Sequence, residues 1–170
     1  MPDLPDQGDD AVSIEVNDES GEGVDGERVS ALARFVLDAL KVHPQAELSV
    51  LAVDVATMSS LHEQWMDEEG PTDVLSFPMD ELRPGKVTEE PEEGVLGDLV
   101  LCPAIAERQG IEAGHGREAE IELLTVHGIL HLLGYDHAEP EEHEEMFGLQ
   151  ARLLAEWVGH DTDRSRVEQA

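Results

Sequence analysis

The most informative segment of this chain spans residues 125–137 and reads Thr-Val-His-Gly-Ile-Leu-His-Leu-Leu-Gly-Tyr-Asp-His. His127 and His131 are four residues apart, so on a helix both imidazoles project from one face, one turn apart. Gly134 can take the left-handed conformation that ends a helix, and a turn there brings His137 back toward the same point. Three neutral imidazoles around one point predict a zinc site whose fourth position is open, as in catalytic zinc sites.

The histidine pattern predicts one zinc ion per chain. Imidazole also suits iron, nickel and copper, but zinc is the first expectation. Zinc peptidases with this spacing carry a glutamate directly after the first histidine, which serves as the base toward the metal-bound water. Here that position is Gly128, which has no group that can take a proton. The histidine spacing on this helix is therefore that of zincin peptidases, but their base is missing. Peptide hydrolysis is the lesser alternative for this reason.

Composition and charge limit the class of protein. The 170 residues fit one domain, and the single cysteine excludes an internal disulfide. The formal net charge of −30 is the opposite of the basic footprint of nucleic-acid-binding proteins. It favours solubility, with attraction to a basic protein partner as the alternative. No apolar run approaches the ~20 residues of a membrane span. The acidic start of the chain lacks the pattern of a signal peptide, so we expect a cytoplasmic protein without a membrane partner.

Apolar spacing predicts four strands and five helices. The strands are expected at 12–16, 48–55, 74–77 and 95–102. Caps and prolines predict where the helices lie: after Asp25, after Thr57, from Pro103, over 118–133 and from Pro140. The order β-α-β-α-β-β-α-α-α predicts an α+β (mixed α/β) fold with a single small mixed sheet of about four strands packed with helices.

The predicted domain organisation is simple. Residues 1–11 are expected to form a disordered acidic tail, 12–158 a single metal-dependent hydrolase domain, and 159–170 a frayed C-terminal tail. An acidic stretch at 80–94 is expected to be a long loop. Cys102 follows an apolar run and is expected to be a buried small side chain rather than a ligand or nucleophile.

Three segments together resemble the YbeY family of bacterial endoribonucleases, also called rRNA maturation factors. They are Pro-Thr-Asp-Val-Leu-Ser-Phe-Pro at 71–78, Leu-Gly-Asp-Leu-Val-Leu at 96–101, and Val-His-Gly-Ile-Leu-His-Leu-Leu-Gly-Tyr-Asp-His at 126–137. The similarity runs from about Val12 to Trp157. The last segment is specific, and the other two add weight through their order and spacing.

The resemblance implies a zinc site made by His127, His131 and His137 and a zinc-dependent endoribonuclease specific for single-stranded RNA. It also implies a role in maturing the 3′ end of 16S rRNA, in ribosome biogenesis and in ribosome quality control. The partners that it implies are small-subunit ribosomal components and an Era-type GTPase. The alternatives are a zinc-dependent metallopeptidase-like hydrolase and a non-catalytic zinc-containing ribosome assembly factor.

Two positions need separate comment. Members of the family commonly carry an arginine, a bidentate phosphate ligand, where this chain has Met66. Methionine cannot take that electrostatic role. Asp136 precedes the third histidine and is a candidate for orienting an imidazole from behind, with a plain turn residue as the equal alternative. The residues that act as general acid and base stay open.

Overall fold

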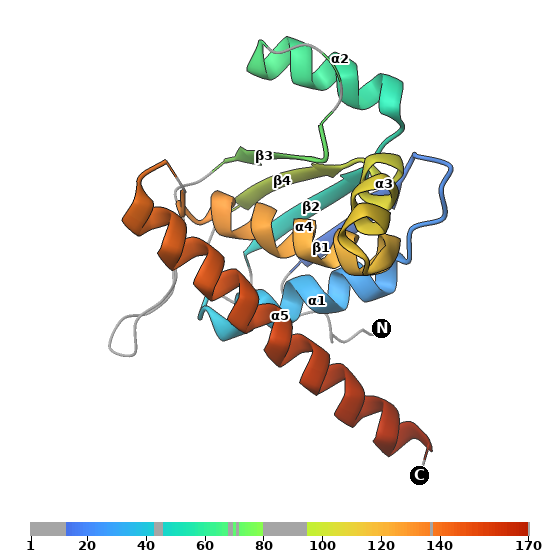
Figure 1. Cartoon of the computed structure of the whole chain (residues 1–170), viewed down its shortest axis with the longest axis vertical. Coiled ribbons are helices and arrows are strands. Elements are labelled where there is room, and N and C mark those ends of the chain that lie inside the picture. The colour runs from blue at the N-terminus through green and yellow to red at the C-terminus, as the bar shows by residue number, and fades with distance from the viewer. Residues whose placement is uncertain are drawn as a thin grey trace, which may run out of the picture.

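The computed structural model describes residues 13–42, 46–67, 70, 72–79, 95–136 and 138–169. The predicted acidic tail at 1–11, the predicted loop at 80–94 and His137 lie outside the described residues. The order of elements expected from the sequence is confirmed (Figure 1). The elements are β1 (Ser13–Asp18), α1 (Gly26–Ala39), β2 (Glu47–Ala52), α2 (Val55–Met66), β3 (Val74–Pro78), β4 (Val95–Leu101), α3 (Pro103–Ala113), α4 (Gly116–Leu132) and α5 (Pro140–Gln169).

The strands form one mixed sheet of four strands, as predicted, and their order in it is β1-β2-β4-β3. β1, β2 and β4 run parallel, while β3 pairs antiparallel with β4 at the edge. Glu47 pairs with Val95 but Leu48 pairs with Gly97, so β4 carries a bulge at Leu96. Gly97 has a φ of +145°, and a Cβ there would meet the carbonyl oxygen of Phe77 at 2.4 Å, so only glycine fits this close approach.

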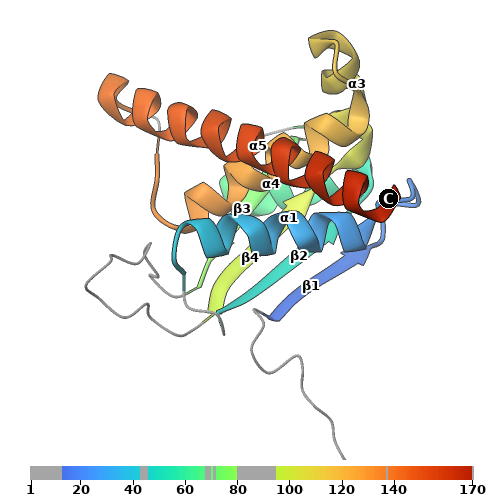
Figure 2. The same cartoon turned by 90° about the horizontal axis from the view of Figure 1, so that it is seen from below.

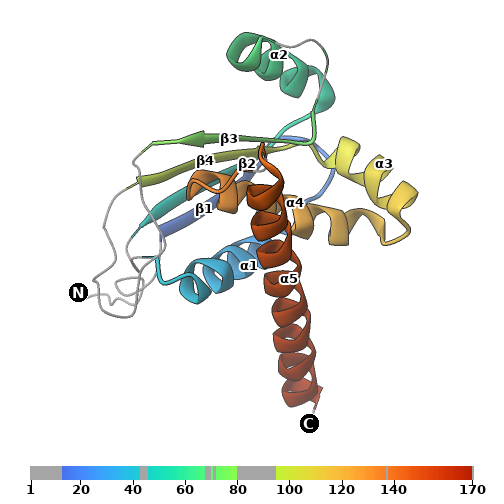
Figure 3. The ribbon, with the colours of Figure 1, turned by 60° about the vertical axis from the view of Figure 1, so that its left-hand side comes forward.

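The two faces of the sheet are covered unequally. α1, α4 and α5 lie on one face and enclose the main core with it (Figure 2), whereas α2 lies on the opposite side near β3 (Figure 3). The smaller second core includes Met58 of α2, Leu75 of β3 and Val100 of β4. Cys102 is fully buried there, and burial raises the pKa of its thiol, so the expected inert core residue is confirmed.

Aspartate side chains cap the starts of α1 and α2. Asp25 caps α1 as predicted, because its carboxylate accepts a hydrogen bond from the backbone N–H of Arg28 at 3.1 Å. The predicted cap of α2 is wrong by three residues. Asp54 is the cap and Thr57 is the residue whose N–H it binds, at 2.8 Å. Aspartate and threonine both serve as caps, so the sequence alone did not separate them.

α5 continues as helical backbone to Gln169, which differs from the frayed tail predicted at 159–170. The segment contains no proline, and extending an existing helix adds one backbone hydrogen bond per residue. On the first half of the helix, the apolar face expected from the sequence is confirmed by Met146, Leu153 and Trp157, which are all buried.

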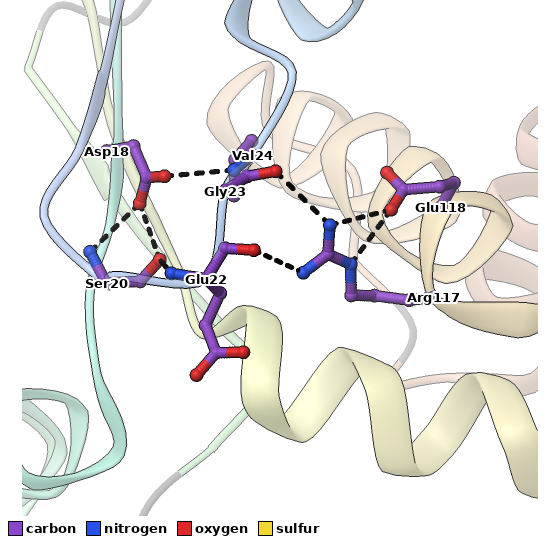
Figure 4. Close-up of polar contacts among 7 residues, drawn as sticks. All are labelled: Asp18, Ser20, Glu22, Gly23, Val24, Arg117 and Glu118. Carbon is purple, nitrogen blue, oxygen red and sulfur yellow. Dashed lines mark hydrogen bonds and ion pairs between the residues drawn. The ribbon is translucent and has the colours of Figure 1, made fainter.

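The loop between β1 and α1 is fixed to the first turn of α4 (Figure 4). Arg117 donates to the carbonyl oxygens of Glu22 at 2.8 Å and Gly23 at 3.3 Å. Within the loop, the carboxylate of Asp18 accepts from the hydroxyl of Ser20 and from the backbone N–H of Val24. These two hydrogen bonds lower the pKa of Asp18 from its ordinary value.

Candidate active site

α4 presents the histidine pair predicted from the sequence. His127 and His131 lie one turn apart and are both half-buried. Their Nε2 atoms are 3.1 Å apart, and their rings meet edge to face with centroids 4.6 Å apart. Two nitrogens bound at 2.0–2.1 Å to one tetrahedral ion lie about 3.3 Å apart. The spacing therefore suits a pair of imidazoles that could hold one metal ion between them.

The end of α4 is built as the sequence predicts. Gly134 has a φ of +98°. Its N–H donates to the carbonyl oxygen of His131, and the N–H of Tyr135 donates to that of Leu130, both at 3.0 Å. This pair of hydrogen bonds is the Schellman motif, which satisfies the last carbonyls of a helix and reverses the chain. The helix therefore ends at Leu132, directly after His131.

Gln150 holds the ring of His127 from behind. Its Oε1 lies 2.9 Å from Nδ1 of His127, and the residue is only 6% exposed. An amide oxygen only accepts hydrogen bonds, so Nδ1 carries the proton. In the neutral ring the lone pair is then on Nε2, which faces His131. This is the tautomer that a metal-binding histidine needs, fixed by the kind of hydrogen bond that usually accompanies such ligands.

Gln150 was not among the predicted site residues, although the sequence carries a signal for it. Met146, Gln150, Leu153 and Trp157 follow the 4-3-4 spacing of one helix face, and all four are buried. A polar residue on an otherwise apolar stripe needs a hydrogen-bond partner. The spacing did not identify His127 as the partner of Gln150, because that contact depends on how α4 and α5 pack against each other.

The paired histidines open onto a surface cavity of about 390 Å³. It lies where the end of α2, the edge strand β3 and α4 meet. The residues that line it are Met66, Asp73, Val74, Leu75, Ser76, Pro78, His127 and His131. The segment 71–78, which carried part of the resemblance, thus contributes most of one wall.

β3 adds polar groups to this wall. The carbonyl oxygen of Asp73 accepts from the N–H of Cys102, and the N–H of Met79 donates to the carbonyl oxygen of Leu96. Residues 73, 75, 77 and 79 therefore direct their backbone groups at β4. Since these directions alternate along a strand, the N–H and C=O of Ser76 point outward from the sheet edge. The hydroxyl of Ser76 donates to the carbonyl oxygen of Gly128 at 3.3 Å.

Gly128 shows why no acidic side chain follows the first histidine. A Cβ at this position would lie 2.6 Å from Cδ2 of Leu99 and 3.4 Å from Cδ1. α4 thus lies so close to β4 that even alanine is crowded. A glutamate here has no room beside the sheet. The position that carries the base in zinc peptidases is therefore a glycine in the sequence and is also too crowded for a larger side chain.

The other predicted residues fall into three groups. His137 lies outside the described residues, and within those residues no three His, Cys, Asp or Glu side chains converge as a metal-binding set. Asp136 is exposed and is not among the residues that line the cavity, and its orienting role stays a prediction. Met66 does line the cavity, so the departure from arginine falls at the site itself.

Two further acidic residues deserve comparison. Asp98, next to the bulge, is exposed on the opposite face of the sheet from Leu99, which packs under α4. It therefore does not support either histidine. Asp73 lines the cavity, and its Oδ1 accepts from the N–H of Val74 at 2.7 Å. In the sequence, Asp73 carried no expectation beyond its place in the segment at 71–78.

Comparison with solved structures agrees with this fold. The chain is similar to TM1509 from Thermotoga maritima, known from a solution structure, with a TM-score of 0.60 and 28% identity over 89% of this chain and 93% of that one. The α+β fold is therefore shared with that protein. Within the described residues, no helix is both long and apolar enough to cross a membrane.

Comparison of sequences defines the family. Residues 14–158 match the family model described as endoribonuclease YbeY. Proteins named endoribonuclease YbeY from a Nocardioides species and from Thermobifida fusca are 70% and 63% identical over 146 residues. Those alignments cover 86% of this chain and 98% and 94% of the relatives. The chain belongs to the YbeY family of endoribonucleases, and the resemblance seen in the sequence is confirmed. It is a hydrolytic nuclease.

Proposed function

We propose that this protein is a zinc-dependent endoribonuclease that cleaves single-stranded RNA in the maturation of the 16S rRNA 3′ end and in ribosome quality control. The observation that carries the proposal is the paired Nε2 atoms of His127 and His131 at the mouth of a cavity, with one tautomer fixed by Gln150. The membership of the chain in an endoribonuclease family supplies the reaction class.

The residues present fit a zinc ion. The 3.1 Å separation of the two nitrogens is close to that of ligands on one tetrahedral zinc. His127, His131 and His137 would hold the ion, one per chain. When bound, zinc would supply a water whose pKa is about 7 and a positive charge beside the phosphate. The remaining chemistry falls to the side chains and backbone of the cavity.

Three groups of the chain have roles in this reaction. Gln150 keeps the ring of His127 in position. The outward N–H of Ser76 is a donor for an oxygen of the scissile phosphate, where a fixed donor stabilises developing charge. Asp73 is the carboxylate at the cavity wall, and because its Oδ1 is held by the N–H of Val74, we assign Oδ2 to take the proton from the attacking water.

The peptidase alternative is weakened because Gly128 leaves no room for the base at its usual position, so that reaction would need an acid from elsewhere in the chain. The assembly-factor alternative differs in what zinc does. If zinc only holds the fold, His127→Ala unfolds the protein. If zinc is catalytic, that variant keeps its far-ultraviolet circular dichroism and loses RNA cleavage.

The cellular setting belongs to the same proposal. Similarity to the family supports a cytoplasmic protein that works with small-subunit ribosomal components and an Era-type GTPase. The net charge of −30 suits contact with basic ribosomal proteins. Docking of that kind would raise the local concentration of RNA at a domain that does not attract phosphates over long distances.

The experiment is a paired cleavage assay with untagged protein. A labelled single-stranded RNA should be cut by the wild type and left intact by His131→Ala and His137→Ala. His160→Ala is the matched control, because His160 is exposed on α5 and packs against Phe35 and Trp157 rather than at the cavity. Equal cutting by wild type and the two ligand variants would identify a contaminating nuclease and remove the proposed activity.

A further inference from the structure

The end of α2 exposes two large apolar side chains beside the active site. Trp65 is 60% exposed and Met66 is 42% exposed. Among the described residues of α2, only Met58 is buried, and Figures 1 and 3 show the helix standing apart from the main body. A tryptophan that is mostly accessible buries little surface for the fold, and exposed apolar side chains that lie together mark interaction sites.

Trp65 is nevertheless held in place. Its ring packs against Phe77 with centroids 6.0 Å apart and an interplanar angle of 73°, an edge-to-face contact. Phe77 lies on β3 between Ser76 and Pro78, and both neighbours line the cavity. One part of the indole is thus supported by the sheet edge, while most of it remains accessible.

The exposed apolar surface adjoins the cavity through Met66 and Pro78, while Phe77 packs on the α2 side of β3. We call Trp65, Met66, Phe77 and Pro78 the apolar ledge. Met66 and Pro78 line the same cavity as His127 and His131. A strand of RNA whose phosphodiester lies at the histidines and which leaves the cavity past Met66 would bring a neighbouring nucleotide to the ledge.

The charge of the cavity favours stacking over phosphate contacts. The described residues that line it include Asp73 and no lysine or arginine. Binding of phosphates by basic side chains is the usual source of affinity for RNA, and this wall offers none. Aromatic rings supply an alternative, because every base has a face that stacks on them and each such contact contributes about 1–3 kcal/mol.

We propose that Trp65 stacks on a base of single-stranded RNA next to the scissile phosphodiester, with Met66 packing beside the same nucleotide. This inference rests on the proposed endoribonuclease function. It explains a preference for single strands, because a base inside a duplex has no face open to an indole. It also predicts that binding at this position depends little on sequence.

The test measures RNA binding and cleavage separately. A short oligouridylate is titrated into the cleavage-deficient His131→Ala protein, with and without the additional change Trp65→Ala. Loss of the indole should weaken binding about 5- to 150-fold, which is the stacking energy expressed as a ratio. Trp65→Phe should restore most of the affinity. Because stacking is not an ionic contact, the ratio should be the same at 50 and 200 mM salt.

The matched control is Ile111→Ala, which removes a 68% exposed apolar side chain from α3 and should leave affinity unchanged. Equal affinity of the proteins with and without Trp65 overturns the stacking proposal, while the endoribonuclease proposal stands if the wild type still cuts RNA. Wild-type protein that neither binds nor cuts overturns both. Sedimentation that shows Trp65-dependent dimers, with unchanged RNA affinity, would instead assign the ledge to a second copy of the chain.

Discussion

Replacing Gln150 with leucine should weaken zinc binding while leaving the fold intact. In the wild type, Oε1 of Gln150 accepts from Nδ1 of His127 at 2.9 Å, and the residue is 6% exposed. Leucine fills a similar volume but accepts no hydrogen bond. The ring of His127 then loses its fixed tautomer, and its buried N–H is left without the acceptor, which costs about 1–3 kcal/mol.

The expected loss of zinc affinity is about 10- to 100-fold, as for other hydrogen bonds behind metal-binding histidines. This ratio corresponds to about 1.4–2.7 kcal/mol. The assay is a competition titration against a coloured zinc chelator at constant pH. Gln150→Glu keeps an acceptor at the same place and should lose less. Gln64→Leu is the control, because Gln64 is exposed on α2.

The reasoning is refuted if Gln150→Leu binds zinc within twofold of the wild type while His127→Ala does not. That result would mean that the ring of His127 is held by other contacts and that the hydrogen bond to Gln150 is incidental. A parallel unfolding curve shows whether the variant is folded, so a loss of affinity is not confused with a loss of structure.

Three further predictions concern packing, charge and metal. Gly128→Ala should lower the free energy of unfolding by about 1–3 kcal/mol, since the added Cβ would lie 2.6 Å from Leu99. Denaturant unfolding measures this loss, and the additional change Leu99→Ala should reduce it. A single variant as stable as the wild type would contradict the packing. Asp18→Asn should lower the unfolding midpoint equally at pH 7 and pH 5. The pKa of Asp18 is lowered in the fold, so the stabilisation by its carboxylate disappears only as the pH falls below 3.8 toward that lowered value. If the difference between variant and wild type already shrinks between pH 7 and pH 5, a lowered pKa is contradicted. Removing zinc with a chelator should abolish RNA cleavage reversibly with little change in far-ultraviolet circular dichroism, because His127 and His131 are only half-buried and line a surface cavity. Unfolding on chelation would favour the assembly-factor role.

The elements of this fold could be predicted where local patterns control them. The 3-4 spacing of α1 and the alternation of the strands led directly to the observed order of elements. The same patterns do not determine which strand partners which. β3 runs antiparallel and lies at the edge because it pairs with β4. This pairing joins residues that are far apart in the chain, so local patterns do not predict it.

The candidate site shows the same division. The spacing of His127 and His131 and the stop at Gly134 were readable because a helix and its end are local structures. Gln150 and Asp73 reach the site only through the packing of α5 and β3 against α4. The sequence also predicted that Gly128 removes a base, but the physical reason, the contact with Leu99, needed the tertiary structure.

The most direct test of the account is a crystal structure of the zinc-loaded protein with anomalous scattering measured at the zinc edge. We predict one peak per chain, about 2.0–2.1 Å from Nε2 of His127 and of His131, with His137 as the third ligand and Gln150 still bonded to Nδ1 of His127. A zinc peak elsewhere on the protein, or His127 and His131 bound to no ion, would contradict the account.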